Sequence, residues 1–292
     1  VGVLLASVVM GIPRTVARLA GMHPQSIENS SDSPKFELMN IIYRFLAARN
    51  LISLSVVSKG ALRSWAQYTD IPADAFHVNY DAFEPNFLGE PQGNRSAIRR
   101  SLGMPADAPV VGGVFRMAPE KDPFLWLDVA CCLANRLPEV RFLIVGTGPM
   151  WEAFRTRAES KGIGDRIYMP VNVNIDLCNY YRAMDVFLHT SKREGFGLVV
   201  VEAQHFGLPV VARPVGGIPE ALAADDTGMM VRDRNPTTIA DAVSQYLHDD
   251  SERRRIAAIA PSLVRQRFSP KANMAGYLEL YQMGGRRGEK PF

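Results

Sequence analysis

A regular alternation of short β-branched runs with longer amphipathic segments is the feature that most constrains how this chain can fold. It begins at Pro109 and continues through the C-terminal half. Strands that alternate with helices are joined by right-handed crossovers and form a parallel sheet, so the pattern predicts a doubly wound α/β domain. We expect its strands at residues 110–115, 140–145, 166–169, 185–189, 209–212 and 228–231. We expect its helices at residues 124–136, 150–161, 176–182, 198–205 and 218–223.

Residues 1–88 repeat this alternation in a shorter form. Strands are expected near residues 14–18, 53–57 and 76–79, and helices near residues 2–10, 36–48 and 59–68. Because about three strands is half of a complete Rossmann domain, we expect an incomplete N-terminal Rossmann-like domain, either truncated or reduced. Residues 89–107 are predicted to link it to a second Rossmann-like domain at residues 108–268, and residues 269–292 are predicted to form a C-terminal helix and tail.

Composition excludes several classes of protein. Thirty-three Lys and Arg against 30 Asp and Glu leave a net charge of +3, without the clustered positive charge that nucleic-acid binding requires. The three cysteines indicate neither a disulfide framework nor a zinc site. The apolar run at residues 1–12 is too short to span a bilayer and predicts a buried helix. What remains is a soluble α/β protein, which we expect to be cytoplasmic.

The most informative stretch, residues 191–211, reads SKREGFGLVVVEAQHFGLPVV. Glycines around a predicted helix start let a ligand approach backbone N–H groups, and the helix dipole favours an anion there. Glu194 precedes the helix and Glu202 lies about one turn inside it. The two carboxylates can therefore contact different ends of a hydroxyl-rich ligand whose phosphate occupies the amides between them. The alternative is that both glutamates are ordinary surface charges.

A second candidate site is the loop after the first strand of this domain, which carries Arg116 and Lys121. Open α/β sheets bind ligands at the carboxyl ends of their strands, where this loop is expected. An arginine fork and a lysine point charge can clamp a diphosphate. Alternatively, Lys121 pairs with Glu120 or Asp122. Two further glycine loops, at residues 146–149 and 215–220, are consistent with tight strand-to-helix turns.

Together these motifs resemble the C-terminal domain of retaining, family-4 glycosyltransferases with the GT-B fold, among the glycosyl transferases group 1. The hallmark of that family, Glu-x7-Glu, stands here as Glu194-GFGLVVV-Glu202. Arg116 and Lys121 match the diphosphate site, and GTGPM at residues 146–150, DVFLHTS at 185–191 and PVVARPVGGIPEAL at 209–222 fit the pattern. The match covers about residues 50–282.

The resemblance implies a role for each matching residue. Arg116 and Lys121 would stabilise the departing nucleotide diphosphate, Glu202 would hold the ribose hydroxyls, and Glu194 would contact the transferred sugar. Other donor contacts are expected from the backbone amides of Phe196, Gly197 and Leu198 and, at the edge that binds the base, from Val171 and Asn172.

One position departs from the family pattern. The family commonly places a histidine after a strand of the N-terminal, acceptor-side domain, where it contacts the donor sugar. Here Ala20 stands in the closest register and His23 follows three residues later. Either His23 takes that place or the contact is absent and His23 is an ordinary surface residue.

The resemblance implies transfer of a sugar from a nucleotide diphosphate donor to an acceptor hydroxyl with retention of configuration. The expected donor is a UDP-sugar, since uridine is the commonest base in such enzymes. The sequence has no Asp-x-Asp metal motif, and two cations can stabilise the leaving group, so we expect metal-independent catalysis without a cofactor. The expected acceptor is a carbohydrate or lipid-linked molecule of polysaccharide or glycolipid biosynthesis, with peripheral association at the inner face of the membrane left open. The alternatives are a nucleotide-sugar epimerase on the same scaffold and a non-catalytic or truncated sugar-nucleotide-binding domain.

Overall fold

A computed structural model describes residues 15–24, 34–89, 93–170 and 177–283 of the 292-residue chain. The chain divides into two compact units. Unit 1 comprises Val1–Ala82, Glu194–Phe196 and Phe268–Phe292, and unit 2 comprises Phe83–Arg193 and Gly197–Arg267. The predicted helix at residues 2–10 lies outside the described residues.

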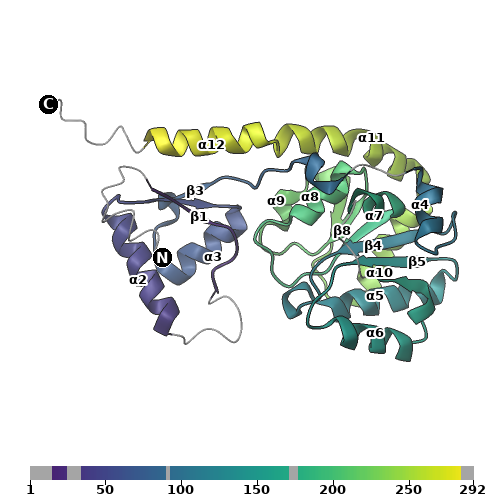
Figure 1. Cartoon of the computed structure of the whole chain (residues 1–292). Helices are drawn as coiled ribbons and strands as arrows, with labels where there is room; N and C mark the ends of the chain where they lie inside the picture. The colour runs from purple at the N-terminus through teal and green to yellow at the C-terminus, as the bar shows by residue number, and fades with distance from the viewer. Residues whose placement is uncertain (1–14, 25–33, 90–92, 171–176, 284–292) are drawn as a thin grey trace. The chain divides into compact units, whose positions relative to one another are not determined.

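Unit 1 is built on a three-stranded parallel sheet in the order β1-β2-β3. Its elements, coloured purple to blue and yellow in Figure 1, are β1 (Val16–Leu19), α2 (Pro34–Ala48), β2 (Ser53–Val56), α3 (Lys59–Thr69), β3 (Phe76–Val78) and α12 (Pro270–Met283). Ser58 caps α3, because its side chain accepts a hydrogen bond from the Ala61 amide. The three strands agree with the sequence prediction to within two residues at each end.

The C-terminal helix α12 belongs to unit 1, although it follows unit 2 in the sequence. Asn79 donates a side-chain hydrogen bond to the carbonyl of Asn273 at 3.1 Å, and Asn273 donates one to the carbonyl of Tyr80 at 2.7 Å. At Gly276 a Cβ atom would come within 2.5 Å of the Asn79 side-chain oxygen, so a glycine permits this close approach. The helix is therefore fastened to the end of β3.

Unit 2 contains a six-stranded parallel sheet in the order β6-β5-β4-β7-β8-β9. Its strands are β4 (Val110–Val114), β5 (Arg141–Val145), β6 (Ile167–Tyr168), β7 (Val186–His189), β8 (Val210–Ala212) and β9 (Gly228–Met230). This is the 3-2-1-4-5-6 order of a Rossmann sheet, and β4 and β5 pair in register from Val110–Arg141 to Val114–Val145. The doubly wound parallel sheet predicted for this half of the chain is confirmed.

Helices cover both faces of this sheet, with α5, α6 and α10 on one face and α7, α8 and α11 on the other (Figure 1). Their bounds are α5 (Pro123–Arg136), α6 (Trp151–Ser160), α7 (Leu177–Ala183), α8 (Leu198–His205), α9 (Ile218–Ala221), α10 (Pro236–His248) and α11 (Asp250–Arg267). Trp126 of α5 is fully buried and packs against Phe142 of β5. Strands that are buried on both faces read as continuous apolar runs, which explains the strong sequence signal.

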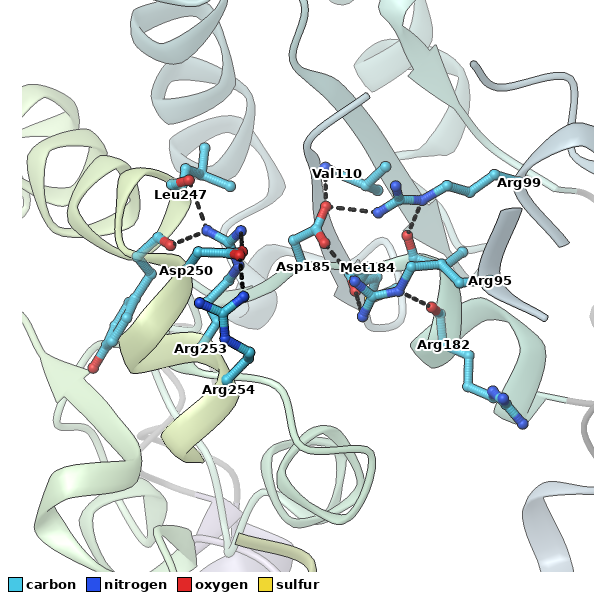
Figure 2. Close-up of polar contacts among 12 residues, drawn as sticks. Arg95, Arg99, Val110, Arg182, Met184, Asp185, Leu247, Asp250, Arg253 and Arg254 are labelled. Atoms are coloured by element: carbon cyan, nitrogen blue, oxygen red, sulfur yellow. Dashed lines mark hydrogen bonds and ion pairs between the residues drawn. The ribbon is translucent and has the colours of Figure 1, made fainter. Parts of the chain in front are cut away.

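Residues 95–101, within the stretch predicted to be a linker, form helix α4 (Arg95–Ser101) of unit 2. Two of its arginines bind one buried carboxylate, as Figure 2 shows: Asp185 accepts from Arg95 at 2.7 Å and from Arg99 at 2.6 Å. The other Asp185 contact is the Val110 amide at 2.8 Å. Asp185 immediately precedes β7 and Val110 begins β4, so the cluster fixes α4 to the amino edge of the sheet.

Two helices, α10 and α11, follow β9 along the chain. Arg253 of α11 donates to the carbonyls of Tyr246 and Leu247, at 2.5 and 2.6 Å, and so satisfies the last turn of α10 (Figure 2). Within the described ranges, no helix is long and apolar enough to span a membrane.

Candidate functional site

The topology of unit 2 places its candidate site at the carboxyl edge of the sheet, between β4 and β7. The chain winds from β4 through β5 to β6 in one direction and from β7 through β8 to β9 in the other. Ligands of open α/β sheets bind at such a switch point, in the crevice outside the carboxyl ends of the strands. The loop after β4 carries Arg116 and Lys121, and the loop after β7 leads to Gly197 and α8.

The loop after β4 presents one cation to solvent and holds the other close to the protein. Arg116 is exposed and makes no side-chain hydrogen bond or ion pair with any residue in the described ranges, whereas Lys121 is half-buried at the end of a short 3-10 turn, Pro119–Lys121. The five guanidinium N–H donors of Arg116 therefore have no acceptor among the described residues.

The GTGP loop, residues 146–149, packs against the loop that carries Arg116 and Lys121. A Cβ atom at Gly146 would lie 2.1 Å from the Phe115 carbonyl oxygen, and one at Gly148 would lie 2.5 Å from the Met117 carbonyl oxygen. Both glycines also have positive φ, 132° and 156°. The two loops are joined by backbone hydrogen bonds from Met117 to Thr147, 3.0 Å, and from Met150 to Met117, 2.9 Å. The glycines thus act in packing, and they fix the backbone on either side of Arg116.

Gly197 directly precedes helix α8, at the N-cap position, and lies in the left-handed region at φ 101°, a conformation that favours glycine. The Leu198 and Val199 amides precede the first hydrogen bond of this helix, which the Val200 amide donates to the Gly197 carbonyl at 2.9 Å. These first amides carry the positive end of the helix dipole. On the second turn, Glu202 accepts a hydrogen bond of 2.5 Å from the hydroxyl of Tyr181. Burial raises the pKa of Glu202, and the tyrosine hydrogen bond works against that rise.

A buried carboxylate ties three loops of this edge together. Asp122, which adopts a left-handed conformation at φ 52°, accepts from Arg234 at 2.6 Å and lies 3.9 Å from the Lys192 ammonium. Its carbonyl accepts from the Thr190 hydroxyl at 3.3 Å. The loops after β4, β7 and β9 are therefore held to one another next to Lys121.

Two predicted site residues belong to unit 1 with the short segment Glu194–Phe196. Phe196 is buried between Tyr80 and Phe268, with ring centroids 5.5 and 5.4 Å away. The Gly195 carbonyl accepts a 2.6 Å hydrogen bond from the Ser58 hydroxyl. Glu194 is half-buried beside them. The phenylalanine side chain is thus a packing residue, while the predicted ligand contacts of Glu194 and the Phe196 amide stay predictions.

His23 is fully buried in unit 1, so the reading of it as an ordinary surface residue is wrong. Its Nε2 atom hydrogen-bonds the Asn40 side chain at 2.8 Å, and its ring stacks on Tyr68 at 5.2 Å. Its backbone amide donates to the Ser64 hydroxyl at 3.1 Å. Burial lowers the pKa of His23. These contacts give it a packing role, and its predicted contact with a donor sugar stays a prediction.

Val171 and Asn172, predicted to bind the base, lie outside the described residues. Sequence reasoning missed Tyr181 and Gln204, and it missed the contacts of Asp122 with Arg234 and Lys192. The Gln204 amide, fully buried, donates to the carbonyls of Val200 and Ala221 and accepts from the Ala223 amide and the Thr227 hydroxyl. It fastens α8 to the turn around α9. Among the described residues, no group of three or more His, Cys, Asp and Glu side chains is arranged to hold a metal ion.

This arrangement coincides with a family match over more than half of the chain. Residues 94–262 match the family described as glycosyl transferases group 1, and the chain belongs to that family.

Two curated relatives illustrate the match. A D-inositol 3-phosphate glycosyltransferase of Corynebacterium glutamicum (strain R) is 32% identical over 265 residues, 88% of this chain and 63% of the relative. The Vi polysaccharide biosynthesis protein VipC/TviE of Salmonella typhi is 29% identical over 82% of this chain and 41% of its own length. The chain thus spans less than two thirds of the length of these relatives.

Solved structures agree on the fold. Anabaena Alr3699/HepE, crystallised with UDP, superimposes with a TM-score of 0.80 at 23% identity, over 96% of this chain and 75% of that protein. TarM of S. aureus gives a TM-score of 0.73 at 18% identity, over 92% of this chain and 50% of TarM. The expected GT-B-type α/β fold is therefore confirmed.

Proposed function

We propose that the protein is a retaining glycosyltransferase of family 4, which transfers a sugar from a nucleotide diphosphate donor to an acceptor hydroxyl. The observation that carries this proposal is the meeting of two anion-binding features at the switch point of unit 2. The exposed Arg116 follows β4, and the N-terminus of α8 follows the neighbouring strand β7.

The charges suit a departing diphosphate. When the glycosidic bond to the diphosphate breaks, negative charge grows on the leaving phosphate, and fixed positive groups lower the barrier. Arg116 and Lys121 supply such groups, and the α8 amides supply aligned dipoles. This arrangement supports catalysis that needs no metal ion. Neither glutamate has to act as a covalent nucleophile, because Glu202 and Glu194 are proposed to bind hydroxyls of the ribose and of the transferred sugar.

The donor is proposed to be a UDP-sugar, since Alr3699/HepE was crystallised with UDP and UDP-glucose. The relative named for Vi polysaccharide biosynthesis supports an acceptor of polysaccharide or glycolipid biosynthesis. An association with the membrane surface stays a prediction.

Calorimetry with UDP and transfer assays with a panel of UDP-sugars test the proposal. Arg116→Ala and Lys121→Ala are each expected to lower turnover by about 10²-fold or more, because each removes one preorganised positive group. Both variants are also expected to bind UDP more weakly. Arg254→Ala is the matched control: it removes an arginine on α11 that is 73% exposed and pairs with Asp250.

Unchanged transfer in both variants would contradict the assignment. The assay also separates the alternatives. If the protein binds UDP but shows neither sugar transfer nor slow hydrolysis of the donor, a non-catalytic binding domain is favoured. Formation of a 2-epimerised sugar nucleotide favours an epimerase.

A further inference from the structure

The hydrogen bond between Tyr181 and Glu202 links two elements of unit 2 inside the fold. Tyr181 lies on α7 and Glu202 on α8, and the hydroxyl donates to Oε2 of the carboxylate at 2.5 Å. Tyr181 is fully buried. Its ring stacks on Phe206 with a centroid distance of 5.4 Å and an interplanar angle of 9°, and it contacts Phe187 at 5.9 Å. The position of the hydroxyl is therefore fixed by packing on two sides.

The tyrosine constrains both the direction and the charge of the carboxylate. A carboxylate has about four acceptor positions, and the tyrosine hydroxyl takes one of them. Burial raises the pKa of Glu202, while the hydrogen bond from Tyr181 lowers it again and so favours the charged form. Burial and the nearby Glu202 raise the pKa of Tyr181 well above its usual value, so the hydroxyl keeps its proton and remains a donor.

We propose that Tyr181 is a positioning residue that enables this protein to select ribose over 2′-deoxyribose in its nucleotide ligand. Tyr181 holds Glu202 in the orientation in which the carboxylate accepts hydrogen bonds from vicinal hydroxyls. The inference rests on the proposed function, in which Glu202 contacts the ribose, and adds the residue that makes this contact selective.

Selectivity follows from the cost of an unmet hydrogen bond. A site built to bond a ligand hydroxyl discriminates strongly against the analogue that lacks it, because the protein group then stays desolvated and unpaired. If Glu202 is released by loss of its tyrosine partner, the carboxylate can turn away, and the 2′-hydroxyl contributes less. If the role of Tyr181 were purely structural, its loss would instead lower the affinities for UDP and 2′-deoxy-UDP by the same factor.

The test is calorimetric measurement of the affinities for UDP and for 2′-deoxy-UDP in the full chain. We expect the unsubstituted protein to prefer UDP by about tenfold or more, the size of one hydrogen bond to a charged group. In Tyr181→Phe this ratio is expected to fall at least threefold, on the order of half of that preference in free-energy terms. Glu202→Gln should lower the ratio too, and Tyr181→Phe should have no additional effect in a Glu202→Gln background.

Tyr246→Phe is the matched control, since Tyr246 is a buried tyrosine of α10 in the same unit, and its ratio should be unchanged. If Tyr181→Phe does not fold, Phe206→Leu replaces it, because this change removes the ring stacked on Tyr181 and keeps both polar groups. An unchanged UDP to 2′-deoxy-UDP ratio in the folded variant overturns the inference. Failure of the proposed function looks different: the unsubstituted protein then binds neither nucleotide.

Discussion

Arg95 and Arg99 at the amino edge of the unit 2 sheet and Arg116 at its carboxyl edge are used in opposite ways. At the amino edge, Arg95 and Arg99 both bind Asp185, and Arg95 also donates to the carbonyls of Arg182 and Met184, each at 3.0 Å. At the carboxyl edge, Arg116 is exposed and has no side-chain partner within the described ranges. Arg95 and Arg99 use their donors in internal hydrogen bonds, whereas Arg116 keeps its donors for a ligand.

This difference separates stability from binding within one domain. Buried, mutually bonded charges lose a great deal when one partner is removed, because the remaining charge is left desolvated. Solvated charges contribute little to folding, but they are available to a phosphate. The comparison therefore predicts that substitutions at the amino edge lower folding stability and leave nucleotide affinity unchanged. Substitution of Arg116 is predicted to lower nucleotide affinity and leave folding stability unchanged.

Removal of the Asp185 carboxylate is expected to have the largest effect. In Asp185→Ala the buried Arg99 loses its counter-charge and the Val110 amide loses its acceptor, so unfolding should become easier by about 3–5 kcal/mol. Urea denaturation measures this change, and Arg254→Ala, at an exposed pair, should stay within about 0.5 kcal/mol. The affinity of the folded fraction for UDP should be unchanged, and a parallel loss of affinity would break the division between the edges.

Much of the unit 2 architecture could be predicted because its information is local. Strands such as Val110–Val114 and Arg141–Val145 are continuous apolar runs, and each predicted strand overlaps an observed one. Helix α4 is different. Its flanking glycines and prolines resemble a linker, and what holds it is Asp185, more than eighty residues further along the chain. A contact at that sequence distance leaves no periodic trace.

The candidate site, like the fold, could be predicted where its signal is local in the sequence. Arg116, Lys121 and Glu202 are found by their positions after strands and around a helix start. Tyr181, by contrast, gives no signal, because a tyrosine in an apolar helix reads as a core residue and only the fold brings its hydroxyl to Glu202. Likewise, burial of His23 depends on Asn40, Trp65 and Tyr68, which belong to other elements.

Adding a methyl group at Gly148, on the carboxyl edge, is expected to have an effect of intermediate size on both the free energy of unfolding and the affinity for UDP. Gly148→Ala places a Cβ atom 2.5 Å from the Met117 carbonyl and must displace the loop next to Arg116. We expect a loss of about 1–3 kcal/mol in unfolding free energy, typical of overpacking, together with weaker UDP binding. Gly162→Ala is the control, since it has a positive φ of 71° but no atom within 4 Å of its Cβ. It should cost about 1 kcal/mol through strain alone and leave affinity intact. Equal behaviour of the two variants would mean that loop position does not matter for binding.

Protonation of Glu202 is expected to have the smallest effect, and this effect should be confined to the affinity for the nucleotide. Burial raises the pKa of this carboxyl, so it takes up a proton at a higher pH than an ordinary glutamate does. The protonated form loses acceptor capacity for ribose hydroxyls, and affinity should therefore fall as the pH falls. Calorimetry with UDP-glucose between pH 8 and pH 5 measures the slope, because this donor has no phosphate monoester that titrates near neutrality. Glu202→Gln should bind more weakly and with a flatter pH profile, because it lacks the carboxyl that takes up the proton. An identical slope in both proteins would assign the pH dependence to another group and remove Glu202 from the binding edge.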